Sequence, residues 1–284
     1  MPQRCSDGPQ RTVSSHAHIT TPVDQAAGLR RLFAGRVRHI VPLIANPHVA
    51  FAGVVLERIT TALAAGGAST LLVDAADSSP PAATMAHIDL AACVEQLDER
   101  TAYLAARGLP RSYVDTRGSA ASLLTALGNV APKADTVVLH GEVLELARVF
   151  THCELRPLLI TSDHVDAVKH AYAAIKILAQ RCGLMTFDVL MVAPIHSSAS
   201  RRARAIMASL DRCAEGFMGA LLQGWAHIDP AVDVSEPPDA GLCQLLLQQR
   251  RLGDTPAMPS PPPVRNFMPV RAAPATPTWR ATLS

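Results

Sequence analysis

Short runs of β-branched and aliphatic residues alternate along this chain with longer stretches whose apolar positions repeat at helical spacing. His39 to Ile44 shows the first pattern and predicts a strand. Gly66-Gly67 then marks the end of a predicted helix, and Thr70 to Val73 forms a second apolar run that ends at Asp74. The apolar face of that helix consists of Phe51, Val55, Ile59, Ala62 and Leu63. This order predicts a right-handed strand, helix and strand crossover.

The alternation continues to residue 228. Further helices are predicted at about 87–107, at 120–127, from an N-cap at Asp163 to Gly183, and along a stripe from Ala203 to Leu221. Further strands are predicted at 136–139, 158–160, 187–192 and 224–228. The pattern indicates a doubly wound α/β fold with a mainly parallel sheet flanked by helices. Pro42 conflicts with a central position for the first strand, because proline lacks the donor that a sheet ladder requires.

The two ends of the chain differ in composition from its middle. Residues 1–20 are polar, and residues 255–284 contain eight of the 22 prolines. We therefore predict a disordered arm at 1–35, one α/β domain at 36–252 and a proline-rich disordered tail at 253–284. The six cysteines are widely spaced and no leader sequence is recognisable, so we expect a cytoplasmic protein with free thiols. A net charge of only +2 predicts no specific nucleic-acid binding, and membrane contact is expected to be peripheral at most.

The turn after the first predicted strand is where an α/β protein of this kind binds a nucleotide phosphate. Such a turn requires glycines, a lysine and a hydroxyl group for magnesium. Here the turn contains Asn46, Pro47, Phe51, Ala52 and Gly53, with no lysine, serine or threonine between residues 45 and 53. The sequence therefore predicts that ATP and magnesium binding have been lost and that the protein is not an ATPase.

A second unusual segment precedes the α/β pattern. Residues 21–33 predict a short helix with Asp24 as its N-cap and an apolar side that includes Leu29 and Phe33. A helix of about ten residues is marginal in water, so it would order on a partner. Packing of the helix on its own domain is the other interpretation.

Two segments of the chain resemble motifs of known protein families. Residues 171–178, AYAAIKIL, resemble the AYALIKVL helix of the MinD/ParA ATPases, and residues 24–30, DQAAGLR, resemble the DQAxxLR activator motif of the flagellar FlhG branch. The first resemblance covers residues 39–228, and it implies a P-loop-type fold from which the KGGxGK motif is missing. The family's catalytic lysine corresponds to about Ala52, and its switch II aspartate corresponds to His140, whereas Asp74 and Asp77 match acidic positions of the family.

The resemblance also implies a partner and a role. FlhG proteins bind the signal-recognition-type GTPase FlhF through this motif and stimulate its GTP hydrolysis. The motif residues Asp24, Gln25, Ala26, Leu29 and Arg30 are all present. Carried over, Gln25 would orient the attacking water or the partner's catalytic groups, Leu29 would anchor the helix and Arg30 would pair with an acidic surface. Flagellar switch-complex proteins and a flagellar transcription activator are implied as further partners, with location at the inner membrane or cell pole.

The sequence is also compatible with other functions. The chain could be an active MinD/ParA-like ATPase with an unorthodox phosphate loop, or a partner protein of the partition or cellulose-secretion branches. Residues 201, 202 and 204 are arginines that could contact DNA or acidic protein, or could form an ordinary solvated helix face. The leucine-rich stretch after Asp239 could be a peripheral membrane helix or could pack on the domain. The scattered histidines predict no metal site.

Overall fold

The computed structural model describes residues 39–151, 153–194, 197–233 and 235–252 of the chain. Within this part the strands form a single sheet in the order β3-β4-β2-β5-β1-β6-β7-β8. All neighbouring strands are parallel except β3, which runs antiparallel to β4. The strands are β1 (His39–Ile44), β2 (Thr70–Asp74), β3 (Glu95–Gln96), β4 (Thr101–Ala105), β5 (Thr136–Gly141), β6 (Leu158–Ser162), β7 (Thr186–Val192) and β8 (Leu221–Ile228). The predicted doubly wound, mainly parallel fold is confirmed.

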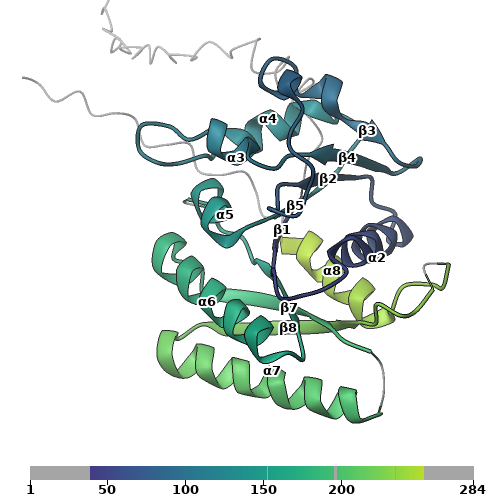
Figure 1. The fold of residues 1–284 in the computed structure, drawn as a ribbon, viewed down its shortest axis with the longest axis vertical. Helices are drawn as coiled ribbons and strands as arrows, with labels where there is room; N and C mark the ends of the chain where they lie inside the picture. The colour runs from purple at the N-terminus through teal and green to yellow at the C-terminus, as the bar shows by residue number, and fades with distance from the viewer. Residues whose placement is uncertain (1–38, 152, 195–196, 234, 253–284) are drawn as a thin grey trace, which may run out of the picture. The chain divides into compact units, whose positions relative to one another are not determined.

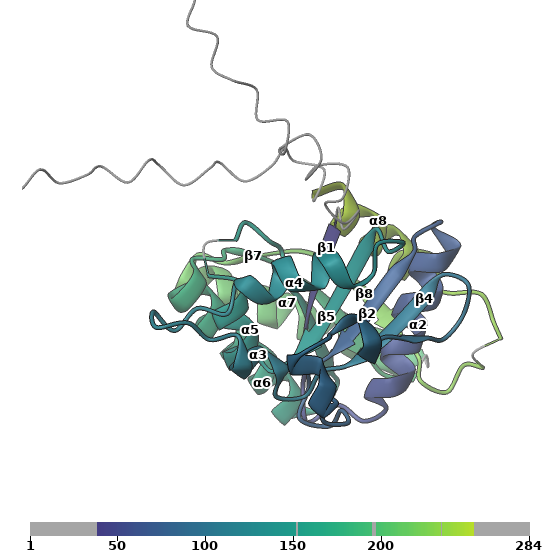
Figure 2. The same ribbon diagram turned by 90° about the horizontal axis from the view of Figure 1, so that it is seen from above.

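Helices cover both faces of the sheet (Figures 1 and 2). On one face α2 and α8 contact each other, and on the other α5 contacts α3, α4 and α6, while α6 also contacts α7. The helices are α2 (Ala52–Ala65), α3 (Leu109–Ser112), α4 (Ser122–Val130), α5 (Val143–Val149), α6 (Val165–Cys182), α7 (Ser197–Met218) and α8 (Ala240–Leu252), with short 3-10 helices η1 (Thr84–His87) and η2 (Ala91–Cys93). A parallel sheet needs this double cover because both of its faces are apolar.

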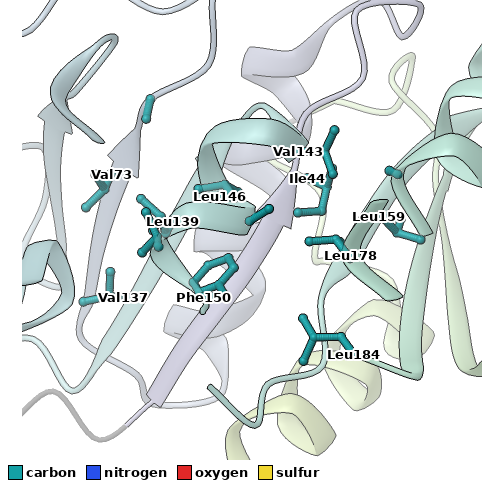
Figure 3. Close-up of a cluster of buried hydrophobic side chains, with 14 of the residues drawn as sticks. Ile44, Val73, Val137, Leu139, Val143, Leu146, Phe150, Leu159, Leu178 and Leu184 are labelled. Atoms are coloured by element: carbon teal, nitrogen blue, oxygen red, sulfur yellow. The ribbon is translucent and has the colours of Figure 1, made fainter. Parts of the chain in front are cut away.

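Two hydrophobic cores fill the space between the sheet and its helices. The larger core joins β2, β5 and β6 to α5 and α6, and Figure 3 shows Leu139, Leu146, Phe150 and Leu178 within it. The smaller core joins the opposite face of the sheet to α2 and α8. Both faces of the sheet are therefore buried. The ends of the strands lie at the edges of the sheet, where a site can form.

Pro42 lies in β1, a central strand, and the sheet accommodates it. The amides of His39 and Ala45 donate to the main-chain oxygens of Asp135 and Gly141 on the β5 side, at 3.1 and 2.9 Å. Because main-chain amides alternate along a strand, the nitrogen of Pro42 faces β6. Pairing with β6 begins only at Leu43, so no ladder donor is missing at Pro42.

The prediction of a helix at 87–107 is wrong. The segment contains η2, β3 and β4, and β4 pairs in parallel with β2 along its whole length. The carboxylate of Asp98 accepts hydrogen bonds from the amides of Arg100 and Thr101 at 2.7 and 2.8 Å, which starts a turn rather than a helix. The alanines of this segment favour a helix locally, but pairing with the sheet overrides that preference.

Two helix boundaries also differ from the prediction. The N-cap of α6 is His164, whose Nδ1 accepts from the amide of Asp166 at 3.3 Å, whereas Asp163 forms an ion pair with Arg202 at 3.3 Å. Leu221 belongs to β8 and not to the preceding helical stripe, because Gly219 adopts φ = +66° immediately after α7. The predicted stop at Gly183 is confirmed by its φ of +70°.

The leucine-rich stretch after Asp239 packs on the domain. The Asp239 carboxylate accepts from the amides of Gly241 and Leu242 at 2.8 and 3.1 Å and so caps α8. Leu242, Leu245 and Leu246 are buried against the sheet in the smaller core. No helix in the described ranges has the length and apolar character needed to span a bilayer. The predicted arm at 1–35, with the motif at 24–30 and Phe33, and the predicted tail at 253–284 lie outside the described residues.

Candidate functional site at the carboxyl edge of the sheet

A cavity of about 350 Å³ lies where the carboxyl ends of the central strands meet the start of α2. In doubly wound sheets this edge is the usual place for a ligand, because the strand order reverses there. The turn after β1, the segment after β2, the end of β5 and one residue of β6 all contribute to its walls. The lining residues are Ala45, Asn46, Pro47, Val49, Phe51, Ala52, Asp77, Ser78, His140, Glu142 and Ile160.

Asn46 holds the turn in place. Its Nδ2 donates to the main-chain oxygens of Ile160 and Ala167, both at 2.9 Å, and its Oδ1 accepts from the amide of His48 at 3.1 Å. The buried side chain thus ties the β1–α2 turn to β6 and α6. Its hydrogen-bonding capacity is used inside the protein, so Asn46 positions the wall of the cavity and is not available for a ligand.

Phe51 precedes α2 in a left-handed conformation, with φ = 63° and ψ = 36°. Such a conformation is rare for a bulky residue and costs about 1 to 3 kcal/mol. Its side chain is 64% exposed, so burial of the ring provides little compensation for this strain. No side chain caps α2, which leaves its first main-chain amides directed toward this edge of the sheet.

Asp74 and His140 lie opposite each other on the neighbouring strands β2 and β5. Nδ1 of His140 is 2.8 Å from Oδ1 of Asp74, and both side chains are buried. A carboxylate can only accept, so Nδ1 carries the proton of this hydrogen bond. Nε2 of His140 has no hydrogen-bond partner within the described part of the chain. The pair therefore places a buried imidazole with one unused nitrogen in the wall of the cavity.

Negative charge dominates the surroundings of this pair. Asp77 and Glu142 line the cavity together with His140, and no lysine or arginine is among the described residues of the lining. The guanidinium of Arg107 lies close by, where its Nη1 donates to the main-chain oxygen of Asp77 at 3.1 Å. The cavity therefore combines carboxylates with an imidazole acceptor, and its apolar wall includes the ring of Phe51.

Two more histidines lie beside the turn. The rings of His48 and His170 meet edge to face with centroids 5.9 Å apart. Burial is the main cause that lowers the pKa of His170, and the nearby Glu142 carboxylate works against it. No group of three or more metal-ligating side chains occurs among the residues that the structure describes.

The structure brings together most residues of the predicted degenerate nucleotide site. The cavity is lined by Asn46, Pro47, Ala52, Asp77 and His140. Asp74 forms a hydrogen bond with His140, and Gly53 lies within α2. Sequence reasoning missed the part played by three lining residues, Ser78, Glu142 and Ile160. Glu142 could have been found because it follows His140 by two residues at the end of a strand.

Comparison with known proteins identifies the fold. No protein-family model matches the chain. No curated protein matches it either. Among solved structures, a plasmid partition protein from Borrelia burgdorferi is 12% identical over 74% of this chain and 98% of its own, with a TM-score of 0.51. A chain of the MinC:MinD cell division protein complex of Aquifex aeolicus is 14% identical over 78% of this chain and 98% of its own, also with a TM-score of 0.51.

The fold is that of the MinD and ParA proteins. A third similar structure is a putative plasmid partition protein from Borrelia burgdorferi B31 bound to AMPPNP, which is 10% identical over 74% of this chain and 98% of its own, with a TM-score of 0.52. At identities this low the similarity establishes a MinD/ParA-like fold and carries no assignment of activity.

Proposed function

We propose that this protein is a nucleotide-independent, MinD-like regulator of flagellar number, placement and assembly. In this proposal the segment with the DQAAGLR motif binds the GTPase FlhF and stimulates its GTP hydrolysis, while the α/β body is a scaffold. Two observations support it: the motif in the sequence, and a first turn whose side chains do not suit a phosphate. The second observation carries the proposal, because it separates this chain from the ATPases that share its fold.

The residues of the cavity do not fit magnesium-ATP. A phosphate site needs cationic neutralisation, and here Asp77 and Glu142 would face the anion without a lysine or arginine among the described lining residues. The free amides of α2 alone resemble a phosphate cradle. Phe51 places a bulky side chain where the main chain of a phosphate loop must approach its ligand closely. We therefore assign no catalytic step to this turn.

The activator role depends on Gln25, within the motif. A glutamine can orient the attacking water in a GTPase, and Asp24 and Arg30 can fix the segment on its partner by capping and by charge pairing. A GTPase assay with purified FlhF and a peptide of residues 1–35 tests this role. We expect stimulation by the wild-type peptide and at least a tenfold weaker stimulation by Gln25→Ala, with Gln10→Ala as a matched control that retains activity. No stimulation by the wild-type peptide would refute the activator role.

The principal alternative is an active ATPase with an unorthodox phosphate loop. It is favoured by one observation, the uncapped N-terminus of α2 at the edge of the cavity. Titration calorimetry of the full chain with Mg-ATP separates the two functions. We expect no binding, and clear micromolar binding would defeat the proposed loss of the nucleotide site.

A second alternative is a partner protein of the partition or cellulose-secretion branches. The similarity to partition proteins concerns the fold alone. Deletion of residues 1–35 from the chromosomal copy distinguishes it from our proposal. We expect altered flagellar number, and unchanged flagellation with altered partition or cellulose export would favour the alternative.

A further inference from the structure

The lining of the cavity includes a buried side-chain acceptor that has no hydrogen-bond partner in the described part of the chain. His140 is only 1% exposed, its Nδ1 is bound by Asp74, and its Nε2 has no partner in the described part of the chain. In the neutral ring, Nε2 is then an acceptor. A buried polar atom without a partner costs stability, so a ligand that donates a hydrogen bond to this atom would recover that cost.

Two carboxylates and an aromatic ring of the lining favour the same kind of ligand. The carboxylates of Asp77 and Glu142 also only accept hydrogen bonds and carry negative charge. Phe51 adds an aromatic ring, which attracts a cation over its face. The strain at Phe51 is also of the kind that protein structures keep at binding sites.

We propose that this cavity binds an organic cation with several N–H donors, either a guanidinium or an ammonium group. His140 Nε2 and the carboxylates of Asp77 and Glu142 accept from the donors, and the Phe51 ring covers the cation. The inference rests on the proposed loss of the nucleotide site, because a phosphate in the cavity would exclude the cation. A free polyamine-like molecule and an arginine side chain of a protein share this chemistry. A volume of about 350 Å³ accommodates either one.

Calorimetry with the full chain and two probes tests the proposal. One probe is agmatine, which represents a free small molecule, and the other is acetyl-Gly-Arg-Gly-amide, which represents an arginine side chain in a protein. We expect saturable binding of at least one probe, and its identity distinguishes the two sources. Inorganic phosphate serves as the anionic comparison and is expected not to bind.

Variants locate the binding site. Glu142→Gln removes one charged acceptor and is expected to weaken binding about tenfold. Phe51→Ala removes the ring and is expected to weaken it about threefold. Glu57→Gln is the matched control, since Glu57 is an exposed carboxylate of α2 outside the cavity lining, and it should bind like the wild type. Far-ultraviolet circular dichroism confirms that each variant is folded.

A second readout follows His140 itself. The imidazole carbon and nitrogen resonances of His140 are expected to shift when the cation binds, whereas those of His227, which lies outside the cavity lining, stay in place. Failure of both probes to bind, or binding that Glu142→Gln and Phe51→Ala leave unchanged, would overturn the inference. Mg-ATP binding in the same calorimeter would overturn the proposed function as well, so the two failures are distinguishable.

Discussion

Asp74 and Asp188 are both buried aspartates of the same sheet, and their surroundings differ. Asp188, in β7, has its Oδ2 within 2.6 Å of Gln249 Nε2 and 3.0 Å of Arg156 Nε, and the main chain of Gly224 also donates to it. Asp74 is held by His140 and by the amide of Ala76, at 2.8 and 3.3 Å. The first carboxylate joins Arg156 and α8 to the sheet, away from the lining of the cavity. The second ends in an imidazole beside an open cavity.

The two environments predict different effects of substitution at the two sites. Burial raises the pKa of Asp188, and the charge of Arg156 and the hydrogen bond from Gln249 act against this rise, so the buried charge depends on its partners. The pair of Asp74 and His140 leaves one ring nitrogen without a partner in the described structure. Changes at Asp188 should therefore affect stability, and changes around His140 should affect binding more than stability.

The largest effect is expected for Asp188→Ala. The variant leaves Arg156 mostly buried without its counter-charge, and the free energy of unfolding should fall by about 3 to 5 kcal/mol. Urea unfolding followed by circular dichroism measures the loss. Asp188→Asn is the matched control, because it retains the shape and an acceptor for Gln249, and its loss should be smaller. Equal stability of Asp188→Ala and wild type would contradict the structural role of the network.

A smaller effect is expected for Asp74→Asn. The asparagine oxygen still accepts from His140 Nδ1, so the variant loses only the charge assistance of the bond and should lose about 1 kcal/mol of stability. The same unfolding experiment, run beside Asp188→Asn, compares the two sites directly. A larger loss of stability for Asp74→Asn than for Asp188→Ala would show that the pair of Asp74 and His140 contributes more to stability than the contacts of Asp188.

The strands and the site were predictable from the sequence to different degrees. β1 and β2 stand out because a fully buried parallel strand is an uninterrupted apolar run. β4 was missed because its residues, TAYLA, are equally compatible with a helix until β2 pairs with them. The site residues at strand ends could be located because parallel strands end at one edge. The strain at Phe51 and the contact of Asp74 with His140 depend on tertiary geometry that no local pattern encodes.

Phe51→Gly is expected to produce opposite effects on stability and binding. Glycine adopts φ = 63° without strain, and the exposed ring contributes little burial, so stability should rise by about 0.5 kcal/mol after the greater chain entropy of glycine is counted. Loss of the ring should weaken cation binding about threefold. Unfolding and calorimetry on the same sample measure both changes. A destabilised variant would show that the ring packs structurally.

The smallest effect concerns pH and His170, beside the cavity. Burial lowers the pKa of His170, while Glu142 and a hydrogen bond to the main chain of Ala45 raise it and His48 lowers it further. The unfolded state therefore takes up the proton at a higher pH than the folded state, because the pKa of a free histidine is about 6.5. The stabilising contribution is present above that pH and is lost as the pH falls toward the lower folded pKa. Urea unfolding between pH 7.5 and 5.5 should show a steeper loss for wild type than for His170→Gln, and parallel curves would show that burial of this ring has no consequence for stability.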